Sequence, residues 1–293
     1  MKLKYPTGSI PAWLRNRANQ MISRPVDLSG TCIHVTQLLQ PAPMLTMQDA
    51  HWLELEVDPN DLIPAMLGTA WHQYLEGSMP PGGVHEQRME VLHNGWTIIG
   101  TPDWYDNKRL IDFKTTRVWS AIMEDGGLKR EWVEQCNVYR WLVNRATGCD
   151  IKSLQTHVVY TDWSATGAMR NSNHPRKRWQ VLDVPVWHLD DARNFIDQRL
   201  KAIEDCPPFS YCTPEERWER GEHWALMKHG RKSAIKKYDT EDEALRACYD
   251  DNGKVINAYY VEHRPGVPVR CNDWCSVKRF CSFGKKLEEA DGS

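Results

Sequence analysis

The stretch GTPDWYDNKRLIDFK, residues 100–114, decides the fold that this sequence predicts. Its second half, extended to residue 115, is typical of a strand, because apolar residues cluster there after a tight-turn signal. Successive side chains of a strand point to opposite faces. We therefore expect Asp112 and Lys114 on one face and Phe113 on the other. Two charges on an apolar central strand are half-buried, which is unfavourable unless something compensates them.

A divalent cation between Asp103 and Asp112, with Lys114 beside it, is the compensation that we expect. Carboxylate oxygens suit Mg²⁺ or Mn²⁺. Such an ion polarises a phosphate and lowers the pKa of a bound water, while an ammonium group orients that water or neutralises developing charge. The pattern therefore favours phosphodiester hydrolysis. The residues alone leave a plainer alternative open, in which Asp112 and Lys114 form a surface ion pair on an edge strand and Asp103 lies in a turn.

The surrounding sequence alternates between helical and strand patterns. The predicted helices cover residues 62–76, 129–147 and 190–203. The predicted strands cover residues 86–93, 96–104, 109–115, 153–160 and 178–186. Asn94-Gly95 is a hairpin signal between the first two strands. This order predicts an α/β or α+β body with one mixed sheet, in which the first three strands form a meander.

Two polar pairs lie on the predicted helices that flank these strands. His72 and Glu76 are one helical turn apart, and His72 comes shortly before the hairpin, so it can reach a metal held there. Gln135 and Tyr139 are also one turn apart, on the helix that follows the strand of Asp112. Their amide and phenol groups are suited to contact a phosphate or a base. Each pair taken alone also fits an ordinary structural role.

Taken in order, these motifs resemble the PD-(D/E)XK nuclease superfamily, in particular the RecB-like exonucleases and the related CRISPR-adaptation nucleases. The resemblance covers residues 68–140 and consists of Gly-x-x-x-His ending at His72, Pro102-Asp103, Asp112-Phe-Lys114 and Gln135-x-x-x-Tyr139. It implies a restriction-endonuclease-like core, with a mixed central sheet flanked by helices. It is the order of four motifs, rather than any single one, that makes the resemblance specific.

The resemblance also implies roles for individual residues. The metal ligands that it implies are His72, Asp103, Asp112 and the backbone carbonyl of Phe113. The catalytic residues that it implies are Asp103, Asp112 and Lys114. Gln135 and Tyr139 would line the DNA path. Glu90, in the strand before the hairpin, is a further acidic candidate, although a solvent-facing strand glutamate is the simpler interpretation.

Three cysteines lie close together near the end of the sequence, in CNDWCSVKRFC at residues 271–281. The charged residues between them make a poor core segment, so the C-x₃-C-x₅-C spacing predicts a soft-metal site at Cys271, Cys275 and Cys281. RecB-like relatives carry a four-cysteine iron–sulphur cluster, which implies a structural [4Fe–4S] cluster here, with Zn²⁺ as the alternative.

The fourth ligand of this cluster departs from the family pattern. In the relatives a distant cysteine lies before the nuclease core, near a helix that begins Thr/Ser-x-Leu. The corresponding segment here starts at Thr36 and contains no cysteine. We expect Cys212 to be the fourth ligand, with Cys206 as the second candidate and His263 as a further alternative.

The sequence therefore predicts four regions. They are an N-terminal arm at 1–30, the PD-(D/E)XK nuclease core at 31–206, a small β-α-β insert at 207–270 and a Cys-rich metal-binding tail at 271–293. Within the insert, strands are predicted at 233–238 and 255–262, on either side of a helix at 240–249. The Cys-Thr-Pro-Glu-Glu-Arg-Trp segment that begins at Cys212 resembles phage-encoded members of the group.

Composition restricts the class of protein. Hydrophobic residues make up 41% of the 293 residues and charged residues 26%, which supports a folded core and excludes a disordered chain. No apolar run approaches the ~20 residues of a membrane span. The opening Met1-Lys-Leu-Lys-Tyr-Pro has no apolar stretch typical of a secretory signal. The sequence therefore predicts a cytoplasmic protein without membrane contact, located in the host cytoplasm if phage-encoded.

The formal net charge is −2, so a nucleic acid would have to bind at a local basic surface. Basic clusters lie at 174–179, 228–237 and 278–286, although such runs are more often solvated faces. Trp104, Trp119 and Trp179 are candidates to stack on unpaired bases, with core packing as the alternative.

The leading hypothesis is a Mg²⁺- or Mn²⁺-dependent deoxyribonuclease, a phosphodiester hydrolase that acts as an exonuclease on single strands or duplex ends of DNA. The resemblance implies a role in phage DNA replication, recombination or repair, with phage recombination or replication proteins as partners. The alternative is a catalytically inactive DNA-binding scaffold with a structural Cys-metal site. A third hypothesis, a zinc-dependent hydrolase or regulator, is disfavoured because closed thiolate sites are normally structural. A nucleoside-triphosphate motor is excluded because the phosphate-binding loop motif is absent.

Overall fold

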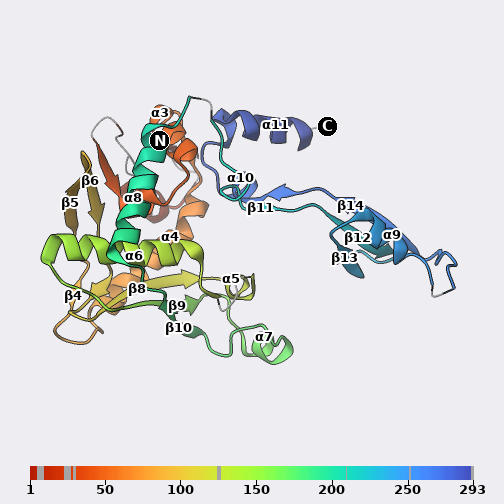
Figure 1. Ribbon diagram of the computed structural model, residues 1–293, viewed down its shortest axis with the longest axis horizontal. Helices are drawn as coiled ribbons and strands as arrows, with labels where there is room; N and C mark the ends of the chain where they lie inside the picture. Colours follow the sequence, from red (N-terminus) through yellow and green to blue (C-terminus); the bar gives the residue numbers. More distant parts are fainter. Residues whose placement is uncertain are drawn as a thin grey trace. The chain divides into compact units, whose positions relative to one another are not determined.

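The computed structural model describes residues 1–4, 10–22, 28, 31–123, 127–208, 210–250 and 252–291. The chain separates into two compact units, unit 1 at residues 1–208 and unit 2 at residues 209–293 (Figure 1). Within the described part of the chain, no helix has the length and apolar character needed to cross a membrane.

Unit 1 contains a five-stranded mixed sheet in the order β10-β9-β8-β7-β4. Its strands are β4 (Val84–His85), β7 (Trp104–Tyr105), β8 (Arg109–Thr116), β9 (Ser153–Tyr160) and β10 (Trp179–Val184). β8 and β9 run parallel along their whole length, whereas the other neighbours are antiparallel. A parallel pair needs a crossover connection, and here it includes the helices α5 (Val118–Met123) and α6 (Arg130–Thr147).

A second sheet of unit 1 has the order β2-β6-β5, with β2 (Cys32–His34), β5 (Met89–His93) and β6 (Trp96–Gly100). The expected meander in one sheet is therefore wrong, because the predicted strand 96–104 breaks into β6 and β7. Pro102 lies in the break and has no N–H to donate to a ladder. At Gly100 the backbone approaches α6 so closely that an added Cβ would lie 2.5 Å from Leu142 Cδ2.

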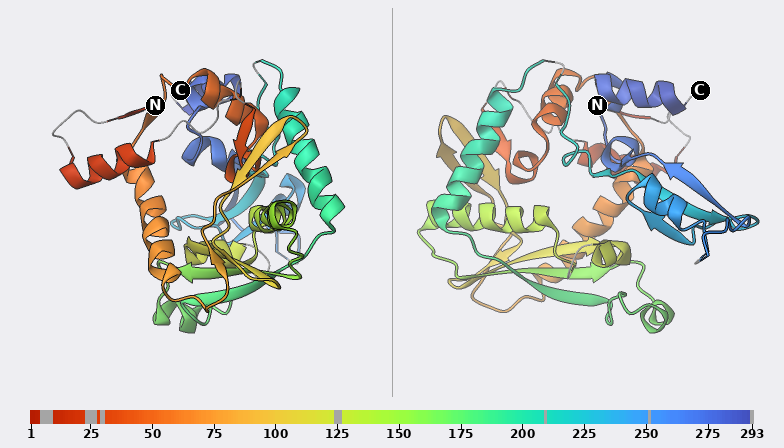
Figure 2. Two further views of the ribbon diagram at one scale, coloured as in Figure 1. Left: turned by 90° about the vertical axis from the view of Figure 1, so that its left-hand side faces the viewer. Right: turned by 45° about the vertical axis from the view of Figure 1, so that its right-hand side comes forward.

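Three long helices pack around these sheets. α6 lies over β8, β9 and β10, and α4 (Pro59–Glu76) lies beside β8 (Figure 2). α8 (Leu189–Glu204) packs on α6 through a stripe of buried residues that includes Ile196 and Leu200. The main core lies between the two sheets, α6 and α8, and α6 ends at Gly148, which adopts the left-handed conformation of a helix C-cap.

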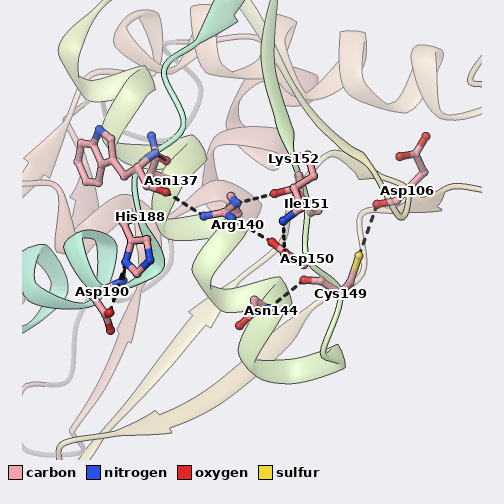
Figure 3. A network of polar contacts seen from close by, with 11 residues as sticks. Asp106, Asn137, Arg140, Asn144, Cys149, Asp150, Ile151, Lys152, His188 and Asp190 are labelled. Carbon is pink, nitrogen blue, oxygen red and sulfur yellow. Dashed lines mark hydrogen bonds and ion pairs between the residues drawn. The ribbon is translucent and has the colours of Figure 1, made fainter.

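A buried polar network joins α6 to the loops at the edge of the sheet (Figure 3). Arg140 donates hydrogen bonds to the carbonyl oxygens of Ile151 at 2.6 Å and Trp187 at 3.0 Å, and to Asp150 at 3.1 Å. Asn137 accepts the backbone N–H of Trp187 at 2.8 Å. These bonds fix the position of α6, the helix that carries Gln135 and Tyr139.

Short elements complete unit 1. They are β1 (Lys2–Leu3), α1 (Ala12–Met21), α2 (Val35–Leu38), α3 (Ala42–Ala50), β3 (Glu56–Val57) and α7 (Ala165–Arg170). The predicted arm at 1–30 contains β1, which pairs with β3, and α1. The rest of that prediction, at residues 5–9, 23–27, 29 and 30, lies outside the described residues.

Unit 2 contains a three-stranded antiparallel sheet in the order β13-β12-β14. The strands of this sheet are β12 (His223–Lys228), β13 (Lys236–Tyr238) and β14 (Tyr259–Arg264), and the helix α9 (Glu241–Arg246) lies between β13 and β14 in the sequence. The sequence analysis missed β12, because Ala225, Leu226 and Met227 are buried in succession and show no alternation. The remaining elements are β11 (Glu219–Arg220), β15 (Val267–Pro268), α10 (Val269–Asp273), η3 (Lys278–Phe280) and α11 (Ser282–Asp291).

Candidate active site

The candidate site lies on β8, just beyond the residues that pair with β7. There, two side chains instead of a strand hydrogen-bond to the backbone of β8. β7 pairs only with Leu110 and Ile111 of β8. Further along, the Phe113 N–H donates to Asp103 Oδ2 at 2.6 Å, and the Phe113 carbonyl oxygen lies 3.0 Å from His72 Nε2. The structure thus brings together three residues named from the sequence, one from α4, one from the break before β7 and one from β8.

Asp103 is almost fully buried, with a side chain that is 12% exposed. Its Oδ1 lies 3.4 Å from His72 Nδ1. Burial and the nearby Asp112 carboxylate raise the pKa of Asp103 to about 7, against the opposing effects of His72 and the Phe113 N–H. In the metal-free protein this carboxyl group therefore titrates near neutral pH.

Asp112 and Lys114 form a buried ion pair. The Asp112 side chain is 1% exposed, and Lys114 Nζ lies 2.9 Å from its Oδ2. The hydrogen bond from Nζ goes to Oδ1 at 3.1 Å, and among the described residues no group donates a hydrogen bond to Oδ2. Burial lowers the pKa of Lys114, but Asp112 and Asp103 outweigh it, so its pKa is raised and the ammonium stays charged. An exposed surface ion pair does not fit this burial.

Gln135 and Tyr139 extend this ion pair along α6. Lys114 Nζ donates to Gln135 Oε1 at 2.9 Å, and Gln135 Nε2 donates to Tyr139 Oη at 3.3 Å. Tyr139 is buried, and burial together with Asp112 raises its pKa, so the phenol is neutral. Half-buried Gln135 therefore holds Lys114, and Tyr139 holds Gln135, while the buried Tyr139 ring offers little surface to DNA.

A pocket of 480 Å³ opens beside this set of residues. α4, including Gly68 and His72, forms one wall, and residues 113–115 of β8 form another. Glu86 also lines the pocket, and its Oε1 lies 3.9 Å from His72 Nδ1. The sequence analysis named Glu90 instead, which lies on β5 and pairs with Arg88 at 2.7 Å. No local pattern distinguishes the two glutamates, because only the position of α4 places one of them in the site.

The donors around the pocket suit a hard divalent cation. They are carboxylate oxygens, a carbonyl oxygen and an imidazole nitrogen. His72 Nε2 lies 3.0 Å from the Phe113 carbonyl oxygen, a hydrogen bond that Nε2 donates because a carbonyl oxygen only accepts. In the described ranges, however, no group of three or more His, Cys, Asp or Glu side chains is already arranged to hold a metal.

Four cysteines come together in unit 2. Burial, Glu216 and the three thiols of Cys271, Cys275 and Cys281 raise the pKa of Cys212 to about 12. Because such charge effects weaken with distance, the three thiols of the tail lie in the same region of unit 2 as Cys212. Among the described residues, however, no three of these side chains are placed so that they could hold a metal. All nine cysteines are free of disulfides.

Arg217 supports this group of thiols. It donates to the Cys212 carbonyl oxygen at 2.5 Å, and its guanidinium stacks 4.0 Å from the Phe283 ring. The two alternative candidates for the fourth ligand have different surroundings. Cys206 belongs to unit 1 and lies 3.6 Å from the hydroxyl of Thr46, and His263 lies 3.0 Å from Glu222.

The three tryptophans named for base stacking differ in exposure. Trp104 is 1% exposed and packs in a core cluster with Ile111 and Phe113, so it has no surface for a base. Trp119 and Trp179 are 57% and 54% exposed.

No protein-family model and no curated protein matches this chain. Solved structures match in part. The crystal structure of SSO0001 is 17% identical, with a TM-score of 0.45, over 66% of this chain and 85% of that one. An alkaline exonuclease (LHK-Exo) from Laribacter hongkongensis is 13% identical, with a TM-score of 0.31, over 48% of this chain and 66% of that one. A candidate exonuclease from Eubacterium rectale is 14% identical, with a TM-score of 0.31, over 51% of this chain and 54% of that one.

Proposed function

We propose that this protein is a Mg²⁺- or Mn²⁺-dependent deoxyribonuclease of the PD-(D/E)XK type that acts as an exonuclease. One observation carries the proposal. Asp112 is a buried carboxylate whose Oδ2 lies 2.9 Å from the Lys114 ammonium but accepts no hydrogen bond from the described residues. A buried carboxylate oxygen without a hydrogen bond is unfavourable, and such oxygens occur at functional sites where a bound cation supplies the missing interaction.

The residues that would hold the ion are Asp103, Asp112, His72 and the carbonyl of Phe113. When bound, the ion supplies polarisation of the scissile phosphate and a bound water of lowered pKa. Metal binding requires Asp103 to lose its proton, and the nearby Lys114 ammonium favours the ionised form. Asp103 and His72 each hydrogen-bond to the backbone of Phe113 at the end of the β7–β8 pairing, which supports this assignment.

Lys114 acts on the phosphate. Its ammonium has three N–H donors, of which Asp112 and Gln135 take two. The third is available to a phosphate oxygen or to the attacking water. As the P–O bond breaks, this charge stabilises the negative charge that develops on the phosphate.

The substrate in this proposal is DNA, as single strands or duplex ends. The ordered motifs over residues 68–140 support this assignment, together with a role in phage DNA replication, recombination or repair alongside phage replication or recombination proteins. The proposed cofactor of unit 2 is a [4Fe–4S] cluster on Cys212, Cys271, Cys275 and Cys281, with Zn²⁺ as the alternative. The spacing of the three cysteines of the tail supports it, together with their effect on the pKa of Cys212.

A cleavage assay tests the proposal. Linear single-stranded and duplex DNA, labelled at either end, and circular DNA are incubated with Mn²⁺, Mg²⁺ or EDTA. We expect the wild type to release label from linear DNA in a metal-dependent way, to spare circular DNA, and Lys114→Ala to release none. Intact DNA under every condition, with a retained gel shift, would instead support the inactive DNA-binding scaffold.

A further inference from the structure

Glu86 occupies an unusual backbone conformation at the edge of the pocket. Its φ is 39°, in the left-handed region that residues other than glycine rarely adopt. It follows β4 directly, and its N–H donates to the Asp103 carbonyl oxygen at 3.2 Å. Such backbone strain concentrates at functional sites, where the surrounding structure maintains it.

This conformation places the Glu86 carboxylate beside His72. The Glu86 side chain is 39% exposed and lines the pocket, and its Oε1 lies 3.9 Å from His72 Nδ1. The other ring nitrogen, Nε2, donates a hydrogen bond to the Phe113 carbonyl oxygen at 3.0 Å, so a cation bound by both groups requires the ring proton to be on Nδ1 instead. The two nitrogens of His72 therefore point to different partners, one toward carboxylates and one toward the carbonyl.

Two carboxylates compete for His72 Nδ1, since Asp103 Oδ1 lies 3.4 Å from it. Both oxygens of Asp103 have other partners, however. Oδ2 accepts the Phe113 N–H, and in the proposed function Oδ1 binds the metal. Glu86 is then the carboxylate left for the proton on Nδ1. Metal-binding histidines nearly always donate their second N–H to such a partner, which fixes the tautomer and the ring orientation.

We infer that Glu86 is a positioning residue: when a cation is bound, its carboxylate holds His72 in the tautomer with a proton on Nδ1. The lone pair of Nε2 then faces the metal beside the Phe113 carbonyl. This inference rests on the proposed function. It assigns to Glu86 a role that acts entirely through His72.

The direct test is Mn²⁺ affinity, measured by isothermal titration without DNA. We expect Glu86→Ala to weaken binding by about 10- to 100-fold, which is typical for the loss of a partner of a metal-bound histidine. Glu86→Gln should lose less, because an amide oxygen can also accept the N–H once the ring is protonated on Nδ1. Glu90→Gln is the matched control, since it removes the same charge four residues away on β5, and it should bind Mn²⁺ as the wild type does.

A double-mutant cycle separates positioning from direct ligation. In a His72→Ala background, Glu86→Ala should cause no further loss of Mn²⁺ affinity. An equal loss in both backgrounds, or none in either, would overturn the inference. Glu86→Gly controls for folding, because glycine adopts a positive φ without strain, so its unfolding midpoint in EDTA should not fall below that of the wild type.

The wild type and Asp112→Ala separate failure of this inference from failure of the proposed function. Wild-type Mn²⁺ binding that Asp112→Ala abolishes, together with normal binding by Glu86→Ala, would overturn only the role of Glu86. A wild type that binds no Mn²⁺ would overturn the proposed function and this inference with it.

Discussion

At the scale of single residues, the raised pKa of Asp103 would make the proposed metal binding depend on pH. Its pKa is raised to about 7 in the metal-free protein, so the proton must leave before the carboxylate can bind an ion. We predict that Mn²⁺ affinity rises between pH 6 and pH 8, by up to about tenfold per pH unit below the pKa. Titrations at pH 6, 7 and 8 measure it, and a flat profile for the wild type would contradict the prediction.

The same group affects the stability of the metal-free protein in the opposite direction. Because the folded pKa of Asp103 lies above its ordinary value of 3.8, the native state binds more protons than the unfolded state between these two values. The contribution of Asp103 to the free energy of unfolding therefore falls as the pH rises from about 4 to about 7. Saturating Mn²⁺ should reverse this trend, because it binds the ionised native site.

At the scale of elements, the position of α6 depends on its buried network. Arg140→Ala would leave the carbonyl oxygens of Ile151 and Trp187 without a donor. We predict that it lowers the free energy of unfolding by about 3 kcal/mol, as expected for lost hydrogen bonds to a buried charged group. Arg145→Ala, an exposed position on the same helix, is the matched control. Urea denaturation measures both variants, and equal effects would contradict the proposed importance of the network.

Elements with a local signal could be predicted from the sequence. β9 and α6 show clear periodicity and β8 is an apolar cluster after a turn signal, and the structure has all three within one residue of the predicted bounds. The break between β6 and β7 depends on the close approach of Gly100 to α6, a contact between distant parts of the chain. Glu86 was missed for the same reason, since its positive φ and its contact with His72 both arise from tertiary structure. For the motif residues, only the spacing within one element is local, as for Asp112 and Lys114 on β8. The contacts of His72 and Asp103 with Phe113 again arise from tertiary structure.

At the scale of the whole molecule, unit 2 has few buried apolar side chains. Within its described residues they are Ala225, Leu226, Met227, Ala244, Cys248 and Val277. A core this small seldom stabilises a fold alone, and a bound metal adds folding free energy. The proposed cluster would therefore stabilise unit 2 by holding together Cys212 and the three cysteines of the tail.

We predict that Cys275→Ser removes the bound metal, any absorbance at about 400 nm from an iron–sulphur cluster, and part of the thermal stability. Metal analysis, absorbance spectra and thermal melts measure these effects. Cys32→Ser, at an exposed cysteine of unit 1, is the control and should change none of them. A wild type without colour, iron or zinc would show that the cysteine site holds no cluster.

The central claim, metal-dependent hydrolysis at the end of the β7–β8 pairing, is tested most directly by Asp112→Asn. This change keeps the size of the side chain and removes the charge that the ion needs. The rate of Mn²⁺-dependent cleavage of linear DNA is measured for both proteins. We predict that the wild type cleaves, that EDTA stops it, and that Asp112→Asn loses at least about 10³-fold in rate, as when an essential electrostatic group is removed. Metal-dependent cleavage by Asp112→Asn at the wild-type rate would contradict the account.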